Sequence, residues 1–224
     1  MSLERREWTA IGLTIVVLAV WNVWGRAQVP GDVRVWLNAA LGLVIAGIGL
    51  WAGLGADGLG LSPSTIGAGL LYGIAAFAVV AAVLAGASGL SFTEGLFTSS
   101  RTDVSASTMW FEALVSIPIG TVVIEELAFR GTLLGLALRR TSRRRAVISV
   151  SVLFGLWHLQ GVIASTSGDP LKVLGACVGT FLATFVAGLV FAWLRLRSGS
   201  LVAPAMAHIA TNSVALVLAW YLAH

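Results

Sequence analysis

Long apolar stretches follow one another along the whole chain, and short turns rich in glycine and polar residues separate them. A helix that crosses the hydrocarbon core of a membrane needs about 20 predominantly apolar residues. Seven stretches meet this requirement: residues 8–25, 34–54, 65–88, 109–131, 146–165, 171–194 and 200–222. The pattern predicts an all-α protein, a polytopic membrane helical bundle of about seven to eight transmembrane helices.

Three of these spans are interrupted by short polar strings, which lie at Glu125–Arg130, Phe154–His158 and His208–Asn212. Carboxylates, a guanidinium, imidazoles and a carboxamide cost free energy in hydrocarbon unless they meet one another or water. Because three separate segments each accept this cost, we expect their polar groups to form one shared site.

The depths of the three strings agree with a shared site. Counted from the arginines that end each span, Glu125, His158 and His208 lie 14, 13 and 11 residues deep. At about 1.5 Å of rise per helical residue, these depths are roughly 21, 20 and 17 Å. The three polar groups are therefore predicted to lie at a similar level of the membrane.

Helical spacing separates the two adjacent glutamates. Glu125 and Glu126 differ by about 100° around a helix, so they do not serve one point equally. Glu126 and Arg130 are four residues apart with the acid on the N-terminal side, which is the favourable order for an ion pair. We therefore assign Glu126 and Arg130 to a supporting pair and leave Glu125 for chemistry.

The other two strings also place side chains on common faces. His208 and Asn212 are four residues apart, as are Phe154 and His158, so the phenyl ring can shield the imidazole from lipid. Trp157 adjoins His158 at membrane depth, and the sequence leaves open whether it lines the site or only packs.

Hydrolysis of a peptide bond uses the groups that remain. A carboxylate and an imidazole, Glu125 and His158, can polarise a water molecule. A second imidazole and a carboxamide, His208 and Asn212, can donate hydrogen bonds to the oxyanion that forms. The polar strings thus indicate an intramembrane hydrolase.

The motifs Glu-Glu-x-x-x-Arg, Phe-x-x-x-His and His-x-x-x-Asn, in this order, resemble those of the CPBP family, also called the Abi family. This family comprises CAAX-processing intramembrane endopeptidases of the Rce1 type and their bacterial relatives. The resemblance implies that Glu125 and His158 activate water and that His208 and Asn212 stabilise the oxyanion. It also implies a peptide or lipidated, CAAX-like protein substrate.

On this basis we divide the membrane domain into N-terminal helices with an interfacial segment, residues 1–108, and a catalytic core, residues 109–224.

A metal offers a second explanation of the same residues, because Glu125, His158 and His208 could ligate zinc as two histidines and a carboxylate. The chain lacks the His-Glu-x-x-His helix of zinc peptidases, and the resembled family is described as independent of metal. We therefore expect no metal and no other cofactor.

Two other functions stay open at this stage. A non-proteolytic membrane scaffold or bacteriocin-immunity protein would need the polar residues only for folding. A proton-coupled transporter would use the glutamates and histidines as a relay, although no internal repeat of the kind common in transporters is evident.

The number and position of the charged residues predict where the protein is located and what it binds. Of the 224 residues, 58% are hydrophobic and 11% charged, whereas a soluble domain has about 25% charged residues. The net charge of +4 comes largely from arginines, which cluster at Arg139–Arg145 in a predicted short loop between spans. Such loops face the cytoplasm under the positive-inside rule. We expect an integral, multi-pass protein of the cytoplasmic membrane with its N-terminus and active-site opening on the cytoplasmic side. Membrane lipids are expected partners, and nucleic acid is not.

Overall fold

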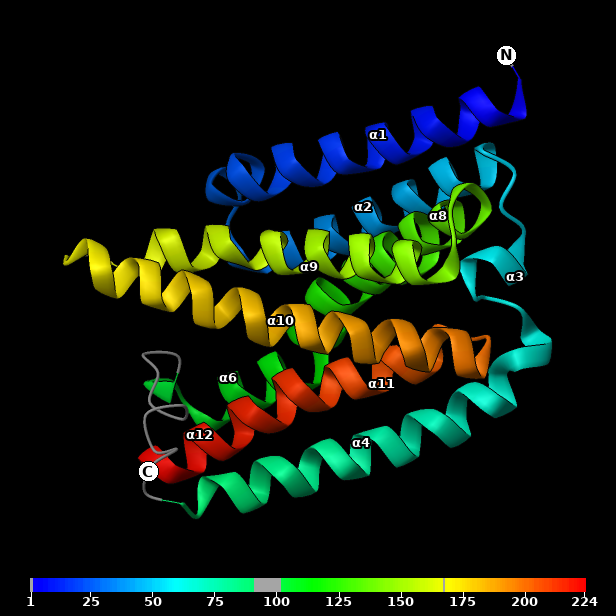
Figure 1. Ribbon diagram of the computed structural model, residues 1–224. Helices are drawn as coiled ribbons and strands as arrows, with labels where there is room; N and C mark the ends of the chain where they lie inside the picture. The colour runs from blue at the N-terminus through cyan, green and yellow to red at the C-terminus, as the bar shows by residue number, and fades with distance from the viewer. Residues whose placement is uncertain (1, 91–101, 167) are drawn as a thin grey trace.

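The computed structural model describes residues 2–90, 102–166 and 168–224, and the described chain is helical with no strand (Figure 1). Within these described ranges, seven helices are long and apolar enough to cross a membrane: Leu3–Val23, Val33–Trp51, Pro63–Ser88, Ala106–Arg140, Arg143–Ser165, Pro170–Ser198 and Val202–Ala223. Each of them corresponds to one stretch predicted from the sequence, so the predicted all-α bundle is confirmed. The predicted interfacial segment of residues 91–108 lies largely outside the described residues.

The N-terminal part contains three long helices, α1 (Leu3–Val23), α2 (Gly31–Trp51) and α4 (Ile66–Ser88). The 3-10 turn η1 (Gly25–Gln28) joins the first two. The short helix α3 (Ala56–Leu59) and the turn η2 (Pro63–Thr65) join the next two. Helix α1 begins at Ser2, whose hydroxyl accepts a hydrogen bond from the Arg5 amide at 3.4 Å and satisfies one free N–H group of the first turn.

The fourth span is one continuous helix from Ala106 to Arg140 that changes its winding several times. It runs through α6 (Ala106–Phe111), the π-helical segments η5 (Glu112–Ser116) and η6 (Pro118–Val122), α7 (Val123–Glu125), the π-helical segment η7 (Glu126–Leu133) and α8 (Leu134–Arg140). It continues nine residues beyond the predicted end at residue 131. π-Helical turns are rare and frequently mark functional sites.

The remaining spans are α9 (Arg143–Ser165), α10 (Pro170–Ser198) and a seventh helix made of α11 (Val202–Ile209), the π-helical segment η8 (Ala210–Val214) and α12 (Ala215–Ala223). The short loop expected at Arg139–Arg145 is reduced to Thr141 and Ser142, and the arginines on either side lie in α8 and α9. Arg139 and Arg140 pair with Glu7 of α1.

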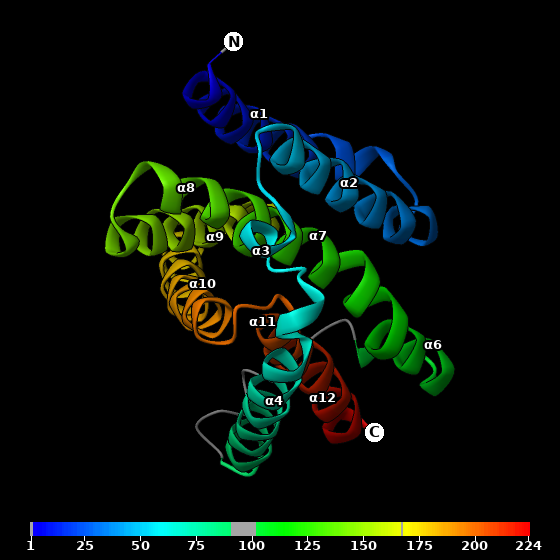
Figure 2. The same cartoon turned by 90° about the vertical axis from the view of Figure 1, so that its right-hand side faces the viewer.

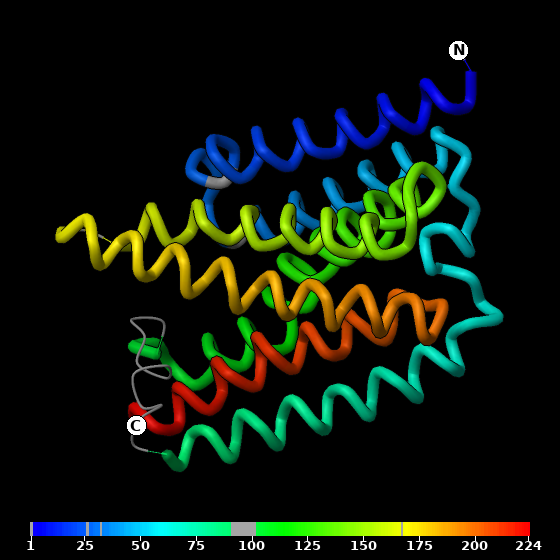
Figure 3. Tube along the Cα trace, in the orientation of Figure 1, coloured from blue at the N-terminus to red at the C-terminus, as the bar shows by residue number. Residues whose placement is uncertain are grey.

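The helices form a bundle with the two termini at opposite ends, as an odd number of spans requires (Figure 3). Seen along the helices, α1 and α2 lie on one side of the fourth span and α9, while α4, α11 and α12 lie on the other (Figure 2). Helices α9 and α10 pack closely because Gly155 lies against the Phe181 ring and Gly188 against Ser151. The three polar strings therefore face one another inside the bundle.

Candidate active site

Glu125 and Glu126 lie near the middle of the fourth span, where α7 gives way to η7. Both are buried, with 4% and 2% of their surface exposed. Their carboxylates face different neighbours, as the 100° helical step predicts. His208 is the one residue that lies near both carboxylates, through a different ring nitrogen for each.

The two oxygens of Glu125 have different surroundings. Its Oε1 accepts a hydrogen bond from the indole Nε1 of Trp157 at 2.9 Å. Its Oε2 lies 3.8 Å from Nε2 of His158 and 3.7 Å from Nε2 of His208. Glu125 Oε2 is thus the point on which both imidazoles converge.

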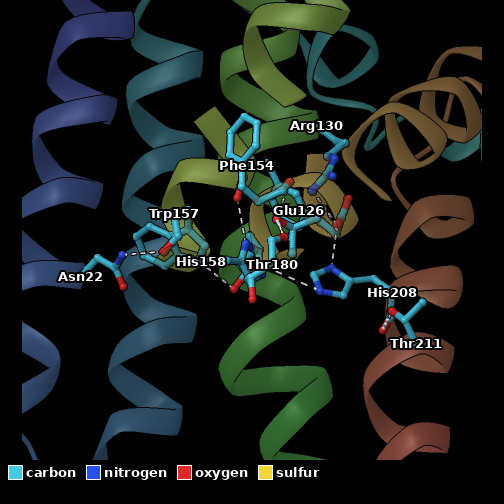
Figure 4. Close-up of polar contacts among 12 residues, drawn as sticks. Asn22, Glu126, Arg130, Phe154, Trp157, His158, Thr180, His208 and Thr211 are labelled. Atoms are coloured by element: carbon cyan, nitrogen blue, oxygen red, sulfur yellow. Dashed lines mark hydrogen bonds and ion pairs between the residues drawn. The ribbon is translucent and has the colours of Figure 1, made fainter. Parts of the chain in front are cut away.

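Glu126 forms the expected ion pair and a contact that helical spacing did not predict. Its Oε1 accepts a hydrogen bond from Arg130 Nη1 at 3.2 Å. The same oxygen lies 2.8 Å from Nδ1 of His208, which comes from the seventh span (Figure 4). A carboxylate only accepts hydrogen bonds, so Nδ1 of His208 carries a proton here.

Arg130 lies between two aromatic rings in the middle of the bundle. Its guanidinium carbon is 3.9 Å from the ring centre of Phe154 and 4.9 Å from that of Phe191. Cation–π attraction is strongest where water is excluded, and Arg130 is 1% exposed. The Phe191 ring also stacks on His208, with 5.0 Å between centres and 28° between planes. Sequence reasoning missed Phe191, which stands in an apolar span without a motif.

His158 is held by its own helix. Its Nδ1 lies 2.7 Å from the carbonyl oxygen of Phe154, one turn earlier, and a carbonyl can only accept. This contact assigns the proton of the neutral ring to Nδ1 and leaves the Nε2 lone pair toward Glu125. The Phe154 ring packs edge-on against the imidazole at 4.6 Å, as the sequence predicted for its shielding role. The His158 side chain is still 27% exposed, the most open of the converging groups.

Asn212 lies one turn beyond His208, in the π-helical segment η8, and is half-buried. Among the described residues, its side chain forms no hydrogen bond. The structure thus brings together seven of the eight predicted site residues by direct contact, and it places Asn212 on the same helix as His208 without a contact of its own. Thr211, beside it, donates a hydrogen bond to the His208 carbonyl at 2.8 Å.

An apolar cavity of about 310 Å³ lies between α1 and α9, beside the site. Its wall includes Trp157, Phe129 and Asn22. The amide Nδ2 of Asn22 donates to the Trp157 carbonyl at 2.7 Å, so α1 is tied to α9 at the level of the site (Figure 4). Asn22 was not among the predicted site residues, because no spacing rule relates α1 to the three strings.

Within the described ranges, no group of three or more His, Cys, Asp or Glu side chains is arranged to hold a metal ion.

The fold and the site together define a class: a multi-pass membrane protein with a buried carboxylate on which two imidazoles converge. The model of the Rce1-like family, described as type II CAAX prenyl endopeptidase Rce1-like, matches residues 106–214, so this part of the chain is similar to that family. The match covers just under half of the chain and includes all three polar strings. No curated protein and no solved structure matches the chain. The family match supports, in general terms, an intramembrane protease of the CAAX type.

Proposed function

We propose that this protein hydrolyses a peptide bond of a membrane-associated substrate with a water molecule activated by Glu125 and His158. The observation that carries the proposal is the convergence on Glu125 Oε2 of two imidazole Nε2 atoms at 3.7 and 3.8 Å. Polar atoms at such separations are commonly bridged by water. A water held there would contact the carboxylate and both rings.

The tautomer of His158 supports a role as acceptor. Since its Nδ1 proton is directed to the Phe154 carbonyl, Nε2 can accept a hydrogen bond from the water. The water would then donate one hydrogen bond to Glu125 and another to His158, which leaves an oxygen lone pair for attack. Glu125 takes one proton as the oxygen attacks, and the other proton stays on the oxygen. Attack on the carbonyl carbon forms a tetrahedral intermediate, and the proton taken by Glu125 passes to the leaving amine as the C–N bond breaks.

His208 and Asn212 are the proposed stabilisers of the oxyanion. With Nδ1 bound to Glu126, His208 would stabilise the oxyanion from Nε2 as an imidazolium, the form in which both ring nitrogens donate. The Asn212 amide would add a second donor from the same helix. Glu126, Arg130 and Phe154 therefore act by orienting His208 and His158.

The same proposal extends to the class of substrate, the membrane in which the protein lies and its orientation there. An apolar, lipid-modified substrate suits a site enclosed by membrane helices, with a CAAX-like prenylated C-terminus as the example that the family suggests. We place the protein in the cytoplasmic membrane with its N-terminus and site opening on the cytoplasmic side, where the arginines of the α8–α9 turn lie. Membrane lipids would be its other contacts, and nucleic acid would not bind. No metal or other cofactor enters the mechanism.

The test is cleavage of an internally quenched peptide that carries a farnesylated cysteine three residues from its C-terminus, by the purified protein in lipid vesicles. Glu125→Gln should lower kcat by about 10²- to 10⁴-fold, the usual contribution of a general base. Glu112→Gln is the matched control, because Glu112 is a half-buried glutamate of the same span outside the site.

Full cleavage by Glu125→Gln would contradict the proposal. Loss of wild-type cleavage on treatment with a strong chelator, with recovery on addition of zinc, would contradict the metal-free mechanism.

A further inference from the structure

The indole of Trp157 distinguishes the two oxygens of the proposed base. Its Nε1 donates to Glu125 Oε1 at 2.9 Å, while Oε2 faces the two imidazoles. A carboxylate can rotate and exchange its oxygens unless a donor fixes one of them. Trp157 is the group that supplies such a donor.

We propose that Trp157 is a positioning residue, which holds Glu125 through Oε1 so that Oε2 stays directed at the water between the two histidines. This inference rests on the proposed function, because it assigns a role relative to the base named there. Trp157 acts through Glu125 and does not itself contact the reacting atoms.

The surroundings of Trp157 are built to hold the indole in place. It is 9% exposed, and the Phe129 ring packs against it at 6.1 Å with 67° between planes. Asn22 of α1 fixes its backbone by donating to its carbonyl at 2.7 Å. Another part of its surface borders the apolar cavity of about 310 Å³, where protein does not back the ring. Helix α1, which lies outside the residues that the family model matches, thus supports Glu125 through Asn22 and Trp157.

A purely structural role makes a different prediction. Buried indole N–H groups usually find an acceptor, and Glu125 would then be only a convenient one. Under that explanation, removal of the N–H group lowers stability and leaves kcat of the folded protein unchanged. Under ours, kcat falls while KM and the fold are retained.

The experiment removes the N–H group and keeps the shape of the ring. Replacement of the Trp157 indole by its benzothiophene isostere, in which sulfur takes the place of N–H, changes little else. Trp157→Phe is a second variant that can be made without a synthetic residue. The matched control is the same pair of changes at Trp220, whose Nε1 donates to the Val104 carbonyl at 2.9 Å away from the site.

We expect kcat for the farnesylated peptide to fall about tenfold to a hundredfold in the Trp157 variants, the equivalent of a lost hydrogen bond to a charged group. KM should change less than about twofold, and the Trp220 variants should cleave normally. Asn22→Leu should lower kcat by a smaller factor. Normal kcat in a folded Trp157 variant, a rise in KM alone, or equal losses at Trp157 and Trp220 would each overturn the inference.

A spectroscopic measurement tests the contact without any substrate. In ¹⁵N-tryptophan-labelled protein, the indole N–H resonance of Trp157 should shift on Glu125→Gln, and that of Trp220 should not. No shift at Trp157 would overturn the inference. If Glu125→Gln is inactive while both Trp157 variants cleave normally, only the positioning role fails; if Glu125→Gln cleaves fully, the proposed function fails.

Discussion

Two clusters of glutamate and arginine in this protein have similar chemistry and different consequences. In the middle of the bundle, Glu126 pairs with Arg130, and both side chains are at most 3% exposed. At one end of the bundle, Glu7 of α1 is 1% exposed and pairs with Arg139 at 3.1 Å and with Arg140. In this second cluster, which we call the end cluster, the arginine side chains are 38% and 21% exposed.

The difference lies in what else the glutamate contacts. Glu126 also holds Nδ1 of His208, an imidazole that faces the proposed base. Glu7 holds only arginines, and Arg139 also donates to the Gly53 carbonyl at 3.0 Å. The end cluster therefore joins α1, the α2–α3 turn and α8, whereas the central cluster includes a histidine of the proposed site.

The largest expected effect comes from breaking the central ion pair. Arg130→Leu should lower the free energy of unfolding by about 3–5 kcal/mol, because it leaves a buried carboxylate without its counter-ion. The double variant Glu126→Leu/Arg130→Leu should recover most of this stability, since no isolated charge remains. Cleavage should stay low in the double variant, because His208 then lacks its carboxylate.

Unfolding of purified protein in mixed micelles by a denaturing detergent measures the stability, and the quenched peptide measures cleavage. If the double variant regains both stability and cleavage, the support of His208 by Glu126 is wrong, and the two clusters are equivalent.

An intermediate effect is expected from the aromatic rings of the central cluster. Phe191→Leu should cost about 2 kcal/mol of unfolding free energy, since it removes a desolvated cation–π contact with Arg130. It should also lower kcat several-fold, because the ring stacks on His208. The matched change near the end cluster is Trp51→Leu, where the ring lies 6.0 Å from the guanidinium of Arg6 and is 46% exposed. That change should cost less than about 1 kcal/mol; an equal cost at both sites would contradict the comparison.

The smallest effect should follow from weakening the end cluster. Glu7→Gln should lower the free energy of unfolding by about 1 kcal/mol, between the values for exposed and buried pairs. Cleavage should change less than about twofold. Added salt should reduce the difference between wild type and Glu7→Gln, because the arginines are partly exposed to water. A large loss of kcat in Glu7→Gln would show that the end cluster, too, acts on the site.

Some contacts of the site could be predicted from the sequence, and others could not. The ion pair between Glu126 and Arg130 is local, so spacing of four residues was enough to predict it. The contact of Phe154 with His158 is local for the same reason. Phe191 and Asn22 could not be found, because each belongs to a helix whose rotation about its axis is set by packing. The end of the fourth span was placed too early, because α8 continues beyond the apolar stretch as far as Arg140.

The sequence alone determined the membrane class, the seven spans and the similar depth of the polar strings, because apolar length and helical rise depend only on local order. The resemblance of its motifs, confirmed by the family match, added the coarse activity. Tertiary structure decided which atoms meet: Glu125 Oε1 with Trp157, Oε2 with both imidazoles, and Glu126 with His208. These contacts join residues 32 to 83 positions apart, and only the packing of whole helices fixes such distances.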